Sequence, residues 1–219
     1  MYIDLVFVGT VILTLLFLYR ATGFSKFVIV VTLAWLAVQA IAGLSGFYVV
    51  PAGEPPRFAL LVLPPVVLIV VLFFVKRGRR FLDGLDVRVL TLLHVVRLPV
   101  ELILFWLYVH KAVPRAMTFE GRNFDILSGL TAPLVWYFGF VKPRLGKRVL
   151  IGWNIVCLLL LANIAVTAVL SGSPFWERFG FEQRNIALSY FPFVWLPCCI
   201  VPTVLLAQLA AIKQLGRRG

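Results

Sequence analysis

Four polar side chains recur at helical spacing inside an apolar tract of the sequence. They are His94, Arg97, Glu101 and Tyr108, and intervals of 3, 4 and 7 residues separate them. In an α-helix this spacing puts side chains on one face. A carboxyl group on such a face can exchange a proton or bind a cation, an arginine can hold an anion, and a histidine can relay protons. The face is therefore the first candidate for a site that binds a small polar solute or a proton.

The same residues also allow a purely structural interpretation. Arg97 and Glu101 stand four residues apart, so they could neutralise each other and fasten their helix to its neighbours. A charge near the centre of a bilayer costs roughly 2.5–3.5 kcal/mol on insertion scales, so under either interpretation this face must look into a helix bundle. Pro99 frees the carbonyl of Val95 from its helical hydrogen bond, which predicts a hinge in this stretch.

Two other apolar tracts carry single polar groups. Gln39 lies in one of them, and Asn163 and Thr167 lie four residues apart in another. These side chains either extend the solute- or ion-binding site or form interhelical hydrogen bonds, which are worth about 0.6 kcal/mol on average. Both interpretations stay open.

Prolines interrupt the last apolar tract at Pro197 and Pro202. Each proline removes one backbone hydrogen bond and crowds the carbonyl four residues earlier, so the carbonyls of Phe193 and Cys198 need other partners. The tract therefore predicts a kinked helix with a hinge. No histidine or third cysteine stands at a usable distance from the cysteines here, so we expect no metal site, and no cofactor motif is present.

Charged residues beside the apolar tracts predict an outer vestibule. Its expected members are Arg57, Glu120, Arg122, Asp125 and Arg184. The arginines precede expected helices, whose N-terminal dipoles also favour anions, so the group could attract an anionic or zwitterionic solute. The alternative is local structure, with Asp125 capping the next helix and Glu120 paired with Arg122.

The composition indicates which elements hold these groups. Of the 219 residues, 62% are hydrophobic and 14% are charged, against roughly 45–50% and about 25% in soluble domains. The apolar tracts are long and do not alternate, which favours membrane-spanning helices over barrel strands. We expect an all-α polytopic integral membrane protein whose residues 1–219 form a single transmembrane domain. Its seven expected helices are 3–19, 27–45, 58–75, 88–109, 126–141, 149–170 and 191–212.

The basic residues predict the orientation. Most lysines and arginines follow the first, third, fifth and seventh expected spans, and this side of the membrane should be cytoplasmic. We therefore expect the N-terminus outside and the C-terminus inside a bacterial inner (plasma) membrane. The net charge of +12 then belongs to the cytoplasmic face, where it attracts anionic lipid headgroups, and binding of nucleic acid is not expected.

A weak internal repeat links the two halves of the chain. Asp4, Thr10, Leu13, Phe17 and Lys26 recur 121 positions later as Asp125, Thr131, Leu134, Phe138 and Lys147. The pattern predicts two parallel triplets of helices joined by an inverting fourth helix, as in some transporters. In this architecture alone, the chain is similar to SWEET sugar transporters and PnuC-type vitamin transporters. None of their sequence motifs occurs here, so the resemblance implies no site residue and no substrate.

The sequence lacks the residues that several classes of membrane protein require. A retinal protein needs a lysine in the middle of its last helix, whereas Lys213 stands at the end of the last expected helix here. The H-E-x-x-H motif of zinc proteases and the G-x-S-x-G motif of serine hydrolases are both absent from the sequence. An enzyme is therefore not expected, although an intramembrane enzyme stays possible. The main hypothesis is a transporter or channel-like protein for a small solute. The alternative is a seven-helix sensor or receptor, or an accessory subunit of a membrane complex, which would need a partner protein.

Overall fold

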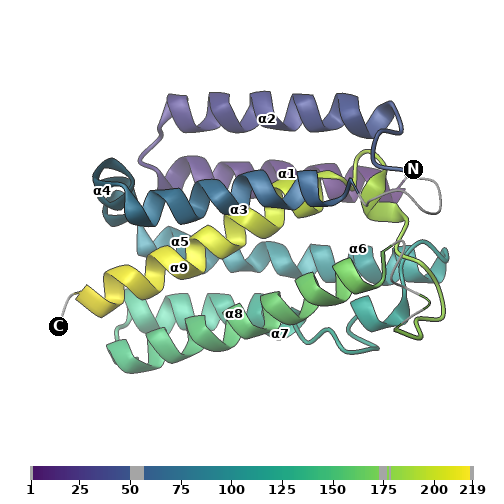
Figure 1. The fold of residues 1–219 in the computed structure, drawn as a ribbon. Helices are drawn as coiled ribbons and strands as arrows, with labels where there is room; N and C mark the ends of the chain where they lie inside the picture. The colour runs from purple at the N-terminus through teal and green to yellow at the C-terminus, as the bar shows by residue number, and fades with distance from the viewer. Residues whose placement is uncertain (1, 50–56, 173–176, 178, 218–219) are drawn as a thin grey trace.

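The computed structural model describes residues 2–49, 57–172, 177 and 179–217, and within them all regular structure is helical. Long helices lie side by side in a bundle (Figure 1). Large apolar side chains are exposed along their outer faces, as on a surface that contacts lipid. The expected all-α architecture is confirmed, and its exposed apolar helices are compatible with the expected membrane protein.

Five helical segments of the described chain are long and apolar enough to cross a membrane. They are α1 (Tyr2–Ala21), α2 (Lys26–Leu44), α5 to α6 (Val87–Leu93, Arg97–Val109), α8 (Lys147–Leu170) and η5 with α9 (Leu196–Ile200, Val201–Arg217). A sixth is counted if α3 (Ala59–Phe74) is joined to α4 (Lys76–Gly84). The fifth expected span forms only a shorter apolar helix, α7 (Ile126–Trp136), and a π-helical turn, η3 (Tyr137–Val141).

Helix α4 was not expected from the sequence. It follows α3 after a bend of 97° and lies across one end of the bundle (Figure 1). Gly78 makes this bend possible, because a Cβ atom there would lie 2.4 Å from the carbonyl oxygen of Leu72. Leu82 is fully buried, while the charged side chains Lys76 and Arg80 are exposed. Burial of one apolar face is what makes this short, basic segment helical.

Polar contacts fasten α4 to α9. Asp83 accepts hydrogen bonds from Lys213 and from Arg217, the latter at 2.5 Å. The amide of Gln214 donates to the carbonyls of Leu82 at 2.7 Å and Leu85 at 2.8 Å. We call this end of the bundle, with α4 and the C-terminal end of α9, the basic end; the N-terminus of α1 lies at the opposite end (Figure 1).

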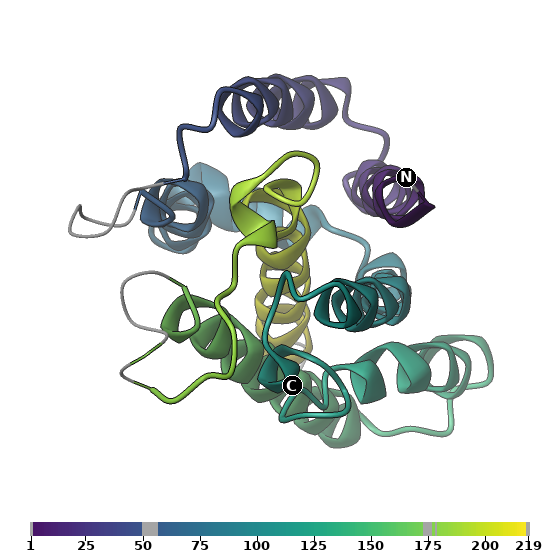
Figure 2. The ribbon, with the colours of Figure 1, turned by 90° about the vertical axis from the view of Figure 1, so that its right-hand side faces the viewer.

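Helix α9 occupies the middle of the bundle. It runs between α1, α2 and α3 on one side and α7 and α8 on the other (Figure 2). It packs against α3, α4, α5 and α8. Ala207, Ala210 and Ala211 on its surface are almost fully buried, and such small residues let helices approach closely. The core of the molecule therefore surrounds α9.

Candidate functional site

Arg97 links three elements in the interior of the bundle. It begins α6 and is 2% exposed. Its Nη1 atom donates to Oδ1 of Asp125 at 2.5 Å and to the carbonyl oxygen of Cys157 on α8 at 3.2 Å. The ion pair of Arg97 is thus with Asp125 and not, as the structural interpretation of the sequence had it, with Glu101.

Glu101 lies one helical turn further along α6 and is 1% exposed. Its Oε1 atom accepts a hydrogen bond from Nδ2 of Asn123 at 2.5 Å. The same amide donates to the carbonyl of Met117 at 3.1 Å, and its oxygen accepts from the backbone N–H of Asp125. Among the described residues, Oε2 of Glu101 has no hydrogen-bond partner. One oxygen of this buried carboxyl group is therefore open to another ligand.

The connection between α6 and α7, residues 110–125, folds back into the bundle. At about 1.5 Å per residue, Arg97 lies about 18 Å along the helix axis from the end of α6 at Val109. Since Asp125 pairs with Arg97, the connection must return over most of this distance. The buried guanidinium explains the return, because it requires a counter-ion that its own helix does not supply. The sequence placed Asp125 in an outer vestibule, whereas the structure pairs its carboxyl group with Arg97 in the interior; a role of Asp125 in attracting a solute stays a prediction.

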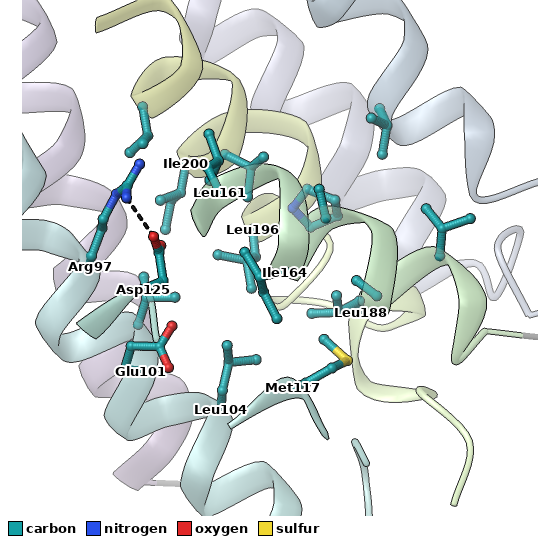
Figure 3. Close-up of a pocket in the computed structure, with 18 of the residues that line it drawn as sticks. Arg97, Glu101, Leu104, Met117, Asp125, Leu161, Ile164, Leu188, Leu196 and Ile200 are labelled. Carbon is teal, nitrogen blue, oxygen red and sulfur yellow. Dashed lines mark hydrogen bonds and ion pairs between the residues drawn. The ribbon is translucent and has the colours of Figure 1, made fainter. Parts of the chain in front are cut away.

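A cavity of about 90 Å³ adjoins these residues. Arg97, Glu101 and Asp125 form part of its wall, and the rest consists of residues of α3, α6, α8, η5 and α9 together with Phe58, Met117 and Leu188. Figure 3 shows the carboxyl group of Glu101 pointing toward Ile164, with the ion pair at one side. A cavity of this size can hold several water molecules. The charged groups therefore stand at one side of an otherwise apolar space.

His94 is near this site in sequence but outside the cavity wall. It lies in the 3-10 turn η1 (His94–Val96), is fully buried, and contacts the ring of Trp153 edge-on at 5.3 Å between centroids. In the part of the chain that the structure describes, neither ring nitrogen has a hydrogen-bond partner. A proton relay through His94 stays a prediction.

The remaining predicted membrane residues lie away from the cavity. Tyr108 is half-buried further along α6, and Gln39 on α2 accepts a hydrogen bond from the hydroxyl of Tyr48. Asn163 donates to the carbonyl of Arg122 at 2.8 Å, and Thr167 donates to the carbonyl of Asn163 at 2.8 Å. None of these four side chains lines the cavity. Of the set predicted inside the membrane, only Arg97 and Glu101 share it.

The predicted vestibule residues are not gathered in the cavity wall either, apart from Asp125. Arg57 donates to the carbonyl of Phe47 at 3.3 Å and lies 5.0 Å from the centre of that ring. Glu120 and Arg122 are exposed, and Arg184 is half-buried. A role of these residues in attracting a solute stays a prediction.

The helices are irregular where the prolines were expected to bend them. The 3-10 turn at His94–Val96 precedes Pro99, and the π-helical turn at Leu196–Ile200 contains Pro197 and precedes Pro202. The carbonyl of Cys198, which Pro202 leaves without a helical donor, accepts a hydrogen bond from Nε1 of Trp35 at 3.0 Å. Pro197 also lines the cavity. Whether these points act as hinges stays a prediction.

Three parts of the site were not predicted. They are the amide of Asn123, the carbonyl of Cys157 and the hydroxyl of Ser128, which donates to Asp125 at 3.4 Å. The sequence did contain a clue to Asn123 and Ser128. A buried arginine requires an acid, and Asp125 is an acid in a polar connection that also contains Asn123. Nothing in the sequence indicated the contact of Arg97 with the carbonyl of Cys157.

Among the residues that the structure describes, no group of three or more His, Cys, Asp or Glu side chains is arranged to hold a metal ion. Comparisons with protein-family models, with curated proteins and with solved structures find no match to this chain.

Proposed function

We propose that the protein is a multi-pass membrane transporter or channel-like protein for a small solute, and that Arg97, Glu101 and Asp125 bind the polar part of that solute. The proposal depends on one observation: these three ionisable side chains share the wall of a cavity inside the bundle. A charged cluster that served packing alone would have its polar atoms enclosed by protein partners. Here Oε2 of Glu101 has none among the described residues.

The charges of the site suggest how it works. Arg97 and Asp125 form an ion pair, so Glu101 is held by the neutral amide of Asn123. A buried carboxylate without its own cation is costly, and Glu101 therefore takes up a proton or a cation together with the solute. Ionisable groups inside membrane proteins commonly mark such pathways. This is the role that we assign to Glu101.

The proposal includes the finer topology. We assign the basic end to the cytoplasmic side of a bacterial inner membrane, with the N-terminus outside and anionic headgroups against α4. The chain then crosses seven times, and α7 together with the returning α6–α7 connection makes one of the crossings. In this arrangement α1 to α3 and α7 to α9 would be the repeated triplets, and α5 with α6 would be the inverting connector.

Reconstitution tests the proposal. The native protein in proteoliposomes should move protons or one member of a broad panel of small solutes. Glu101→Gln should lower this flux about tenfold or more, as loss of one hydrogen bond to a charged group predicts. Glu177→Gln changes an exposed carboxyl group outside the cavity wall in the same way and should leave the flux unaltered.

Two results would overturn transport through this site. One is a flux that Glu101→Gln leaves at the native value. The other is a folded native protein that moves no proton and no solute of the panel, which would instead favour a sensor or an accessory subunit.

A further inference from the structure

The cavity wall limits the kind of solute that fits. Apart from Arg97, Glu101 and Asp125, every wall residue is Ala, Val, Leu, Ile, Met, Phe or Pro. A sugar or another solute with polar groups on all sides would leave several of them without hydrogen bonds, at a cost of about 1–3 kcal/mol each. The solute therefore has one polar end and an apolar remainder.

Arg97 indicates the chemistry of the polar end. Its Nη1 atom is used by Asp125 and Cys157, while Nε and Nη2 have no partner among the described residues. These two atoms lie on the same edge of the guanidinium group, where a carboxyl group can accept both hydrogen bonds. An alcohol offers only one oxygen atom to these two donors. A carboxyl group, with two oxygen atoms on one carbon, can accept a hydrogen bond from each of them.

The charge balance indicates the protonation of that head group. Asp125 already neutralises Arg97, so a bare anion would leave the buried site with a net negative charge. A carboxylic acid bound together with its proton avoids this cost when Glu101 is protonated as well, since an ionised Glu101 would itself leave one negative charge in the site. The O–H group of the acid can donate to the free Oε2 atom of Glu101, while its two oxygen atoms accept from Nε and Nη2 of Arg97.

The position of the cavity indicates the route to it. Its wall includes Phe58 at the start of α3 and Ala168 and Val169 at the end of α8, all toward the end of the bundle opposite the basic end. Val169 is 46% exposed, so the wall continues onto the outer surface of the bundle. Helices α3 and α8 also carry exposed apolar side chains, such as Leu63 and Val166. A mouth beside Val169, between these two helices, would therefore open toward lipid.

From these features we infer that the cavity binds a medium- or long-chain fatty acid, which enters sideways from the membrane between α3 and α8. The cavity of about 90 Å³ is smaller than the roughly 150 Å³ that holds benzene in an engineered core. It accepts the carboxyl group and the first methylene groups, and the rest of the chain lies along α3 and α8. The inference that the fatty acid is the transported solute rests on the proposed function, whereas the inference that the cavity binds it does not.

Photolabelling in proteoliposomes tests this inference. The probe is dodecanoic acid with a diazirine near the carboxyl group, and the comparison probe is the matching dodecanol. The acid should label cavity residues such as Leu104 and Ile164, and unlabelled dodecanoate should compete. Labelling by the alcohol should be about tenfold weaker, since it lacks one hydrogen bond to a charged group.

Paired variants of α8 test the route. Ala168→Phe fills the mouth and should reduce labelling about tenfold or more, whereas Ala162→Phe adds the same side chain at an exposed position outside the wall and should not. Equal labelling by acid and alcohol, or equal labelling of the two variants, would overturn the inference. Labelling of the cavity by the acid probe in a protein that shows no flux would support binding of the fatty acid and refute transport. Flux of another solute in a protein that the acid probe does not label would refute binding of the fatty acid but not the proposed transport.

Discussion

Nη1 of Arg97 and Oδ1 of Asp125 lie 2.5 Å apart, although 28 positions separate the two residues in the sequence. Both side chains are almost fully buried, with exposed fractions of 3% and 7%. The contact ties the start of α6 to the start of α7 and determines how far the α6–α7 connection returns into the bundle. It therefore supports both the fold and the cavity wall.

The first prediction concerns this ion pair. Asp125→Ala leaves a buried guanidinium without its counter-ion, and such a loss typically costs about 3–5 kcal/mol. We expect a clear drop in the free energy of unfolding, measured by denaturant titration in mixed micelles. The double variant Arg97→Leu with Asp125→Leu removes both charges and should recover most of the loss. Native stability in Asp125→Ala would contradict the assigned role of the pair.

The sequence alone predicted the long helices well. The expected spans 3–19 and 149–170 correspond to α1 (Tyr2–Ala21) and α8 (Lys147–Leu170). Their apolar tracts are long enough that local composition determines the helix. Helix α4 escaped prediction because its basic sequence resembles a loop, and only the burial of Leu82 and the close approach at Gly78 stabilise the helix there.

The candidate site was predicted only in part. Helical spacing identified Arg97 and Glu101 correctly as a buried face, but it compares residues within one helix. One of its two interpretations therefore had the two residues neutralise each other, whereas the partners Asp125 and Asn123 come from a distant connection. A polar connection is expected at the membrane surface by default, and nothing local in the sequence indicates that this one returns into the bundle.

The second prediction concerns the bend between α3 and α4. In Gly78→Ala the new Cβ atom would lie 2.4 Å from the carbonyl oxygen of Leu72, so backbone atoms must move. Overpacking of this kind typically costs about 1–3 kcal/mol. Gly84→Ala is the matched control, because a Cβ atom there meets nothing within 4 Å. Thermal unfolding should separate the two variants, and equal midpoints would show that the contact at Gly78 does not constrain the bend.

The third prediction concerns the orientation in the membrane. Cys157, Cys198 and Cys199 are buried, so a membrane-impermeant maleimide should react mainly with an added, exposed cysteine. Arg80→Cys on α4 should be protected in intact cells and labelled after the membrane is opened. Glu120→Cys, in the α6–α7 connection, should be labelled in intact cells. The reverse pattern would place the basic end outside and contradict the proposed topology.

The fourth prediction concerns the attachment of α4 to α9 at low pH. Asp83 accepts a hydrogen bond from the ammonium group of Lys213, which lowers the pKa of the Asp83 carboxyl below its ordinary value of 3.8. A carboxyl group whose pKa is lowered by folding contributes stability above its unfolded pKa, and this contribution is lost as the pH falls through the lower, folded value. Hydrogen exchange of the amides of α4, corrected for the intrinsic pH dependence of exchange, should therefore report weaker protection below about pH 4 than at pH 7. Asp83→Asn cannot titrate, so its protection should be lower at pH 7 and should lose this dependence on pH. If the native protein and Asp83→Asn respond to acid alike, another group controls the attachment.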